Sequence, residues 1–155
     1  MLFLAMLNLV RTNSTHKDFI TLIKDLDAYL SITDGDEHAF YDQFNKVDKI
    51  NHVVIAYENE IPIGCGAIKK FSADSMEVKR MYTSPAGRKK GVATAILKNL
   101  EYWAKDLGYT KCVLETGKRQ LDAIALYQKV GYQTIPNYGQ YIGIDNSVCF
   151  AKDLD

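Results

Sequence analysis

The 155-residue sequence predicts a mixed α/β fold of the α+β type, with elements in the order β-α-α-β-β-β-α-β-α-β-β. Three consecutive strand-like segments are joined by short polar turns, which favours an antiparallel meander. A long amphipathic helix and another strand follow at once, and strand, helix and strand of this length indicate a crossover between parallel strands. Two final strands complete a mostly antiparallel sheet with flanking helices.

The first elements are a strand over residues 6–11 and a helix that Ser14 or Thr15 can cap. Apolar residues recur along this helix at helical spacing, namely Phe19, Leu22, Ile23, Leu26 and Leu30. The turn Asp34-Gly35-Asp36 ends it. We expect a second, shorter helix over about 37–45.

The predicted meander consists of strands over residues 52–57, 62–71 and 76–83. Turn-forming residues separate them, Glu58-Asn59-Glu60 in the first gap and Ser72-Ala73-Asp74-Ser75 in the second. Because both connections are short, neighbouring strands are expected to run antiparallel.

The second half of the chain begins with the most strongly amphipathic helix. Its apolar face carries Val92, Ile96, Leu100, Trp103, Ala104 and Leu107, and Gly108 supplies the C-cap. A strand over 112–115, a helix over about 120–130 and strands over 132–135 and 147–152 follow. No linker, repeat or low-complexity tract divides the sequence, so one domain is predicted over 1–155.

The composition is that of a soluble globular protein, with 47% hydrophobic and 25% charged residues. Nineteen basic residues balance nineteen acidic ones, so charge gives no reason to expect nucleic acid. The opening MLFLAMLNLV lacks the basic start of a signal peptide, and no segment approaches the roughly 20 apolar residues of a membrane span. A cytoplasmic location without membrane attachment is expected.

Three widely spaced cysteines, Cys65, Cys112 and Cys149, each lie in a strand-like apolar run. Their odd number and their surroundings favour buried thiols in a reducing compartment over disulfides. Their spacing fits no zinc site, and no metal is expected.

The most informative segment is MEVKRMYTSPAGRKKGV, residues 76–92, in which a strand runs into a basic loop and then into a long helix. Such a loop offers unpaired backbone N–H groups and the positive end of the helix to an anion. Gly91 allows close approach of a ligand to the backbone, and Ala93 keeps the helix start uncrowded. The spacing of Gly87 and Gly91 fits neither a nucleoside-triphosphate loop nor a dinucleotide fingerprint.

The stretch Arg88 to Ala93 instead reads R-x-x-G-x-A, and here the chain resembles the GNAT superfamily of N-acetyltransferases, whose pyrophosphate loop has this pattern. The strand EVKRMYTSP is similar to the family's fourth strand, and LYQKVGY at 126–132 is similar to its signature on the last helix. The resemblance is strong over about 50–135. One departure is Gln120, where many members have Asn.

The resemblance implies acetyl-CoA as cosubstrate. The family's pyrophosphate loop corresponds here to Arg88, Lys89, Lys90, Gly91, Val92, Ala93 and Thr94. In the family the pantetheine arm pairs with the fourth strand, where a bulge splays it from the parallel fifth strand. The backbone of Met81, Tyr82 and Thr83 is therefore expected to make this contact.

The resemblance also suggests two catalytic residues. Tyr127 corresponds to the tyrosine that protonates the departing sulfur, and its alternative role is packing under the sheet. Glu77 lies eleven residues before Arg88, where some members carry a base, although many use ordered water and a solvated strand carboxylate is the alternative. Strand alternation predicts that Glu77 shares a face with Met81.

Several other residues have simple structural interpretations. The three histidines, His16, His38 and His52, are expected at surface or cap positions, and Trp103 in the core. Glu115 ends a strand near the expected cleft and is expected as a solvated strand end. Lys118 and Arg119 are expected in a solvated loop, and their alternative role is contact with a 3′-phosphate or the substrate. Tyr138 and Tyr141 either wall the acceptor pocket or simply pack.

The predicted function is direct transfer of an acetyl group to a primary amine of a small molecule or peptide, in a ternary complex. The alternative is a non-catalytic acyl-CoA-binding or sensing module. Acidic residues of the N-terminal helical region could favour a cationic amine, or they could form a solvated helix face; they are Asp25, Asp27, Asp34, Asp36 and Glu37. A homodimer is compatible with the sequence, which does not define the oligomeric state.

Overall fold

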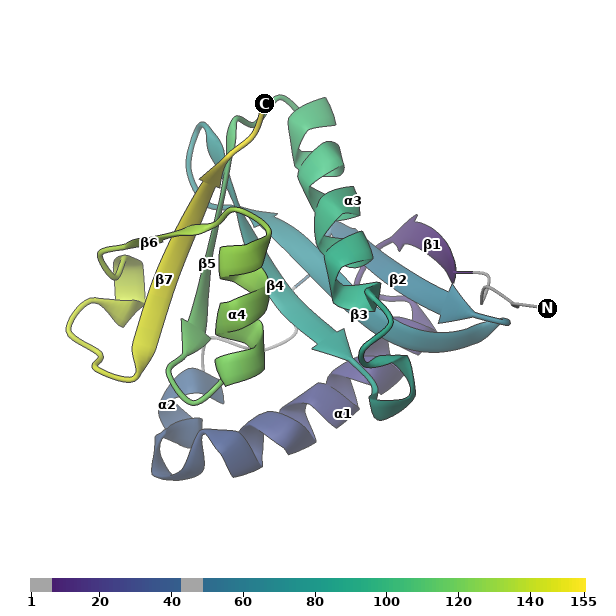
Figure 1. Cartoon of the computed structure of the whole chain (residues 1–155), viewed down its shortest axis with the longest axis horizontal. Coiled ribbons are helices and arrows are strands. Elements are labelled where there is room, and N and C mark those ends of the chain that lie inside the picture. The colour runs from purple at the N-terminus through teal and green to yellow at the C-terminus, as the bar shows by residue number, and fades with distance from the viewer. Residues whose placement is uncertain (1–6, 43–48) are drawn as a thin grey trace.

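The computed structural model describes residues 7–42 and 49–155 (Figure 1). Its elements confirm the predicted order, with three short 3₁₀ helices in addition. They are β1 (Leu7–Thr12), α1 (Lys17–Thr33), η1 (Gly35–Glu37), α2 (His38–Asp42), β2 (His52–Glu58), β3 (Ile61–Lys70), β4 (Ser75–Thr83), η2 (Pro85–Gly87), α3 (Val92–Asp106), β5 (Lys111–Gly117), α4 (Leu121–Lys129), β6 (Gln133–Ile135), η3 (Gly139–Tyr141) and β7 (Ser147–Asp153).

The described strands form a mixed sheet in the order β1-β2-β3-β4-β5-β7-β6. Every neighbouring pair is antiparallel except β4 and β5, which are parallel as the crossover through α3 predicted. The β4–β5 ladder is short, joining Ser75–Glu77 to Lys111–Val113. Beyond Glu77 the two strands part, and Figure 1 shows them diverging beside α4.

Helices cover both faces of the sheet. The face under α3 and α4 is packed by residues of both helices, among them Ile96, Leu100 and Tyr127, against Val54 and other strand side chains. On the opposite face, the predicted apolar residues of α1 pack against the sheet. Val53 and Ile55 of β2 point to this face and belong to the same cluster. This alternation along β2 follows from the two-residue period of a strand. A smaller aromatic cluster joins α2 to the C-terminal strands.

Strand β4 contains a bulge at Arg80. Opposite β3, Cys65 pairs with Tyr82 and Ala67 pairs with Lys79, so β4 holds one extra residue. Arg80 has a φ of 59°, in the left-handed region that side chains rarely adopt. The extra residue reverses the alternation, because Met81 packs with the α3 cluster as Val78 does.

The bulge makes one prediction wrong. Glu77 alternates with Met76 and Val78, which face α3, so it lies on the face opposite Met81 rather than sharing it. Lys79 and Arg80 follow one another on that opposite face, and the Arg80 guanidinium reaches Asp27 of α1.

The predicted strand start, residue 6, and the predicted helix end, residue 45, lie outside the described residues. The N-cap of α1 differs from the prediction. Helix α1 is capped by His16, whose Nδ1 accepts from the Asp18 N–H, instead of by Ser14 or Thr15. The Ser14 hydroxyl instead accepts a hydrogen bond from the Ile50 N–H, which ties the helix start to the next segment.

The three cysteines are buried and unpaired as thiols, as predicted. Trp103 packs against the α3-side core, and its ring meets the His52 ring edge-on at 4.8 Å between centroids. None of the helices in the described residues is long and apolar enough to cross a membrane.

Candidate active site

A cavity of about 720 Å³ opens where β4 and β5 part. Its walls come from the C-terminal half of α1, from β4 and β5, from the start of α3 and from α4. The bulge and the short parallel ladder together create this space, because strands paired along their whole length would close it. The cavity therefore joins the predicted phosphate loop to the predicted catalytic residues.

One end of the cavity is the start of α3. Gly91 is the N-cap residue with a φ of 76°, and no side chain caps the helix. The first turn carries no acidic residue, so its free N–H groups and positive dipole end are not neutralised within the element. A Cβ built at Gly91 would meet no atom within 4 Å, which leaves room beside the backbone. Val92, Ala93 and Thr94 also line this end.

The three basic side chains of the loop point to two different places. Arg88 and Lys89 line the cavity, and the Arg88 Nε donates to the Thr83 carbonyl oxygen at 3.4 Å. Lys90 is not among the lining residues, and its Nζ lies 3.0 and 3.3 Å from the two carboxylate oxygens of Glu58. Of the predicted cofactor residues, Lys90 is thus the one that the structure turns toward a different partner.

The predicted pantetheine strand, Met81, Tyr82 and Thr83, lines the cavity as well. These residues lie beyond the last β4–β5 pair, so β5 does not use their backbone groups. An uncapped helix start, two cations and an open strand edge in one cavity fit the diphosphate and amide-bearing arm of CoA.

Tyr127 projects from α4 into the same cavity wall and is buried. Its ring packs against those of Tyr132 and Phe150, with centroids 5.8 and 6.1 Å away. Burial, and secondarily the charge of Glu115, raise the pKa of Tyr127 above that of an ordinary phenol. The side chain is therefore protonated at neutral pH and can donate its proton.

Glu77 also lines the cavity, and only 12% of its side chain is exposed, so it is not a solvated carboxylate. The Tyr138 hydroxyl donates to Glu77 Oε2 at 2.6 Å. The Lys79 Nζ lies 3.6 Å from the other carboxylate oxygen. The two contacts engage both carboxylate oxygens, and the first gives Tyr138 a polar role beside the cavity.

Glu115 is the site residue that sequence reasoning missed. It was expected as a solvated strand end, but it lines the cavity from β5. Burial raises its pKa to about 7, against the lowering effects of a Ser147 hydrogen bond and the Lys79 charge. Its position at the opening of a strand pair could have signalled this, because a cavity there removes the carboxylate from bulk water.

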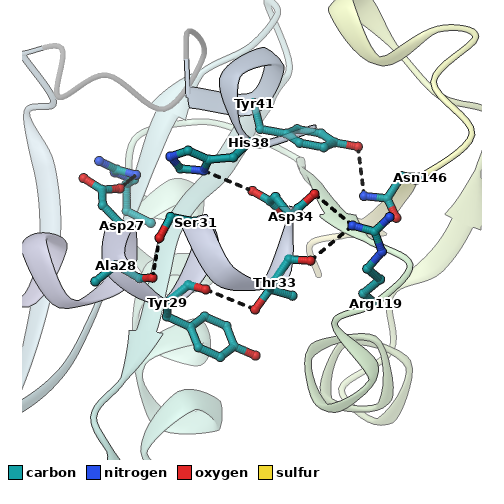
Figure 2. Close-up of polar contacts among 11 residues, drawn as sticks. Asp27, Ala28, Tyr29, Ser31, Thr33, Asp34, His38, Tyr41, Arg119 and Asn146 are labelled. Atoms are coloured by element: carbon teal, nitrogen blue, oxygen red, sulfur yellow. Dashed lines mark hydrogen bonds and ion pairs between the residues drawn. The ribbon is translucent and has the colours of Figure 1, made fainter. Parts of the chain in front are cut away.

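A hydrogen-bond chain holds the Glu115 carboxylate. The Ser147 hydroxyl donates to Glu115 Oε2 at 2.7 Å and lies 2.9 Å from the Tyr41 hydroxyl oxygen. The Asn146 amide in turn donates to that Tyr41 oxygen at 3.3 Å, the contact drawn in Figure 2. Helix α2 and β7 thus fix the orientation of a carboxylate that belongs to β5.

Arg119 lies in an exposed turn, as expected, and its side chain also bridges to the end of α1. Its Nη1 donates to the carbonyl oxygens of Thr33 and Asp34, at 3.2 and 2.8 Å, and Figure 2 shows this fork. Its Nη2 lies 3.4 Å from a Glu37 carboxylate oxygen. The carbonyls at the end of α1 are satisfied in this way.

The acidic residues of the N-terminal helical region are therefore largely engaged within the protein. Asp27 pairs with Arg80, Glu37 pairs with Arg119, and the Asp34 carboxylate lies 3.8 Å from His38 Nδ1. These contacts weaken the expectation of a cation-attracting surface. Tyr141 is buried and lines the cavity, as expected for a pocket wall.

The fold and this cavity are those of an acyl-CoA-dependent acyltransferase, and the comparisons with known proteins agree. Residues 19–132 match the family model described as the acetyltransferase (GNAT) family. The chain belongs to the GNAT family and is an acyltransferase enzyme. Members of this family use acetyl-CoA and act on amine acceptors.

Two relatives show the extent of the sequence similarity. An uncharacterized N-acetyltransferase of Bacillus subtilis, YsnE, is 35% identical over 101 residues, which cover 64% of this chain and 67% of the relative. The IAA acetyltransferase of Azospirillum brasilense is 30% identical over 124 residues, covering 79% of this chain and 81% of that protein.

Solved structures share the fold along nearly the whole chain. A Klebsiella pneumoniae protein assigned as an acyl-CoA N-acyltransferase superposes with a TM-score of 0.81 at 28% identity, covering 97% of this chain and 99% of that one. A GNAT acetyltransferase of Elizabethkingia anophelis with acetyl-CoA bound gives 0.68 at 19% identity, covering 96% and 98%. The second likeness concerns the fold alone.

Proposed function

We propose that this enzyme transfers an acetyl group from acetyl-CoA directly to a primary amine of a small molecule or peptide. The observation that carries the proposal is the single cavity between β4 and β5, which has the uncapped start of α3 at one end and buried proton-transfer groups at the other. Bound acetyl-CoA supplies the acetyl group as a thioester.

The donor is held by backbone groups more than by side chains. The free N–H groups after Gly91 bind the diphosphate, and Arg88 and Lys89 add positive charge beside them. The open edge of β4 at Met81 to Thr83 pairs with the pantetheine amides. Lys90 would have to leave Glu58 to join this site.

Tyr127 is the proposed general acid, with its hydroxyl proton going to the sulfur of the departing thiolate. Burial keeps the phenol protonated at neutral pH, and it also raises the basicity of a thiolate released in the same cavity, so the proton can pass from one to the other.

Of the two carboxylates, we assign the general base to Glu115 rather than Glu77. Glu115 has its pKa raised to about 7, where both protonation states are accessible at working pH. Glu77 already accepts a hydrogen bond from Tyr138 and pairs with Lys79, so both of its carboxylate oxygens are engaged by the protein. Glu115 therefore takes the amine proton, directly or through one water.

The decisive variant is Tyr127→Phe, which removes the hydroxyl and keeps the packed ring. Because a positioned proton transfer is worth ~10²–10⁴-fold, kcat should fall by about that factor with an amine panel and acetyl-CoA. CoA affinity by calorimetry and the melting temperature should stay near wild type. A wild-type protein that binds CoA and acetylates no amine would instead support a non-catalytic acyl-CoA-binding module.

A further inference from the structure

The Arg80 guanidinium occupies an unusual position at the cavity. It stands at the β4 bulge with a φ of 59°, and only 3% of its side chain is exposed. Residues held in a sparsely populated backbone conformation gather at functional sites, where the surrounding structure maintains them. Arg80 is also one of the residues that line the cavity, on the α1 side of the sheet.

Only one of the three nitrogen atoms of this guanidinium has a hydrogen-bond partner within the described residues. Its Nη1 donates to Asp27 Oδ1 at 3.1 Å, and the Asp27 side chain is 42% exposed. Within the described residues, Nε and Nη2 are buried and have no hydrogen-bond partner. These two atoms form one edge of the guanidinium plane, whose parallel N–H groups match the two oxygens of a carboxylate.

We infer that this free edge of Arg80 binds a carboxylate of the acceptor, so that the acceptor is an amino acid or a closely similar amino-carboxylate. The inference rests on the proposed acetyl transfer and names its substrate class. A buried guanidinium with unused donors favours a ligand that supplies both negative charge and paired acceptors. Lys79 precedes Arg80 on the same face of β4, but its ammonium is already paired with Glu77, which leaves Arg80, among the described residues, as the cation with unused donors there.

The Nε and Nη2 atoms are covered in the ligand-free chain, so binding includes a side-chain rotation that turns their edge toward the cavity. The Asp27 side chain is 42% exposed, so it can either move with the guanidinium or give up the ion pair to water when Arg80 rotates. The amine of the same acceptor then lies toward the β5 side of the opening, where Glu115 lines the cavity. Carboxylate and amine are thus recognised on the two strands that part.

The test compares amino acids of graded chain length with their carboxamides, using acetyl-CoA and free-CoA release. The wild type should prefer at least one acid over its amide by about 10-fold or more in kcat/KM, since a site built to bind a polar group rejects analogues lacking it. Arg80→Met should remove this preference by raising KM for the acid more than KM for the amide, so that the two values of kcat/KM become similar. Arg80→Lys should keep part of it.

Arg119→Met is the matched control, because it also removes an arginine that contacts α1 but does not line the cavity. It should retain the preference for acids. Equal use of acids and amides by the wild type, or a folded Arg80→Met enzyme that still prefers acids, would overturn the inference. If Arg80→Met does not fold, the inference is tested by the ratio of kcat/KM for acid and carboxamide in the wild type and in Arg80→Lys. A ratio that is unchanged in Arg80→Lys would then overturn it.

Failure of the proposed function has a different signature, namely no acetylation of any amine. In that case the same pairs are compared by calorimetry on the CoA complex. Tighter binding of acids that Arg80→Lys weakens would support the Arg80 site, and equal binding of acids and amides would overturn it.

Discussion

The carboxylates of Glu77 and Glu115 lie in one cavity but have opposite surroundings. Glu77 has a phenol donor at 2.6 Å and an ammonium at 3.6 Å, whereas Glu115 has one serine donor and a partly buried position. Burial is the main cause of the raised pKa of Glu115, so its ionisation falls near neutral pH. The two residues should therefore respond differently to removal of charge.

We expect Glu115→Gln to lower kcat/KM by ~10²–10⁴-fold, the usual worth of a general base. The wild-type rate should fall as pH drops below about 7, because Glu115 then holds a proton. Initial rates across pH should show that this component of the acidic limb disappears in Glu115→Gln. Glu77→Gln is the comparison, because ionisation of the acceptor amine affects the rates of both variants in the same way. Glu77→Gln should retain the fall in rate below about pH 7. Its loss in Glu77→Gln alone would reverse the assignment.

The same residue predicts a dependence of stability on pH. The pKa of Glu115 is raised in the folded state from its ordinary 4.5 to about 7, so the unfolded chain releases this proton first as pH rises. Its contribution to stability is present below about pH 4.5 and is lost as pH rises through 7. Glu115→Gln should therefore melt above the wild type at pH 8, with the difference shrinking toward pH 4.5. A constant difference across this range would contradict the assigned burial effect.

Residues in short motifs could be placed from the sequence, whereas residues whose surroundings come from distant strands could not. The spacing of Arg88, Gly91 and Tyr127 was informative because these residues, chosen from short local motifs, line the same cavity. The burial of Glu115 depends on the distance between two strands far apart in sequence. Lys90 looked like its neighbours in the basic run, yet its contact with Glu58 arises from β2, which no local pattern encodes.

At the scale of elements, the start of α3 depends on glycine for two separate reasons. Gly91 has a positive φ, and its missing Cβ leaves open space in the cavity. Gly108 follows the other end of α3 with a φ of 95°, also with open space around a built Cβ, and does not line the cavity. The two positions separate backbone strain from obstruction of a ligand.

We predict that Gly91→Val and Gly108→Val lower the melting temperature by similar amounts, because both force a branched side chain into the left-handed region. Only Gly91→Val should abolish CoA binding in calorimetry, by blocking approach to the helix N–H groups. Dephosphorylated pantetheine, which lacks the diphosphate, should bind both variants as weakly as it binds the wild type. Equal CoA affinity for the two variants would remove the loop from the donor site.

The elements themselves were largely predictable because their signals are local. Amphipathic spacing defined α1 and α3, and short turns defined the meander of β2, β3 and β4. The bulge in β4 escaped because one extra residue leaves hydrophobicity unchanged and appears only in pairing with β3. The prediction that Glu77 and Met81 share a face depended on alternation past Arg80, and it was wrong for that reason.

At the scale of the whole molecule, all three thiols are buried in the sheet. Burial raises the pKa of Cys65 and of Cys112 to about 12, and it raises that of Cys149 as well. Thiolate is the nucleophilic form, so none is suited to accept an acetyl group.

We therefore expect direct transfer within a ternary complex. Initial-rate patterns should be sequential, and mass spectrometry after mixing with acetyl-CoA alone should show no acceptor-reactive adduct. A thiol reagent should modify the native protein slowly and the denatured protein at three sites. An acetylated cysteine that transfers its group to the amine would overturn this mechanism.

The parting of β4 and β5 also gives the protein a strand border in the middle of its sheet, rather than at its rim. Unsatisfied strand borders attract other extended chains, and proteins usually bury or charge them. In the proposed function, this border is covered by the pantetheine arm of CoA, which binds and leaves with each turnover. The solubility of the protein should therefore depend on the concentration of CoA. Concentrated protein stripped of CoA should self-associate, and added CoA should reverse the association. Added CoA should also raise the melting temperature, because it binds only the folded protein.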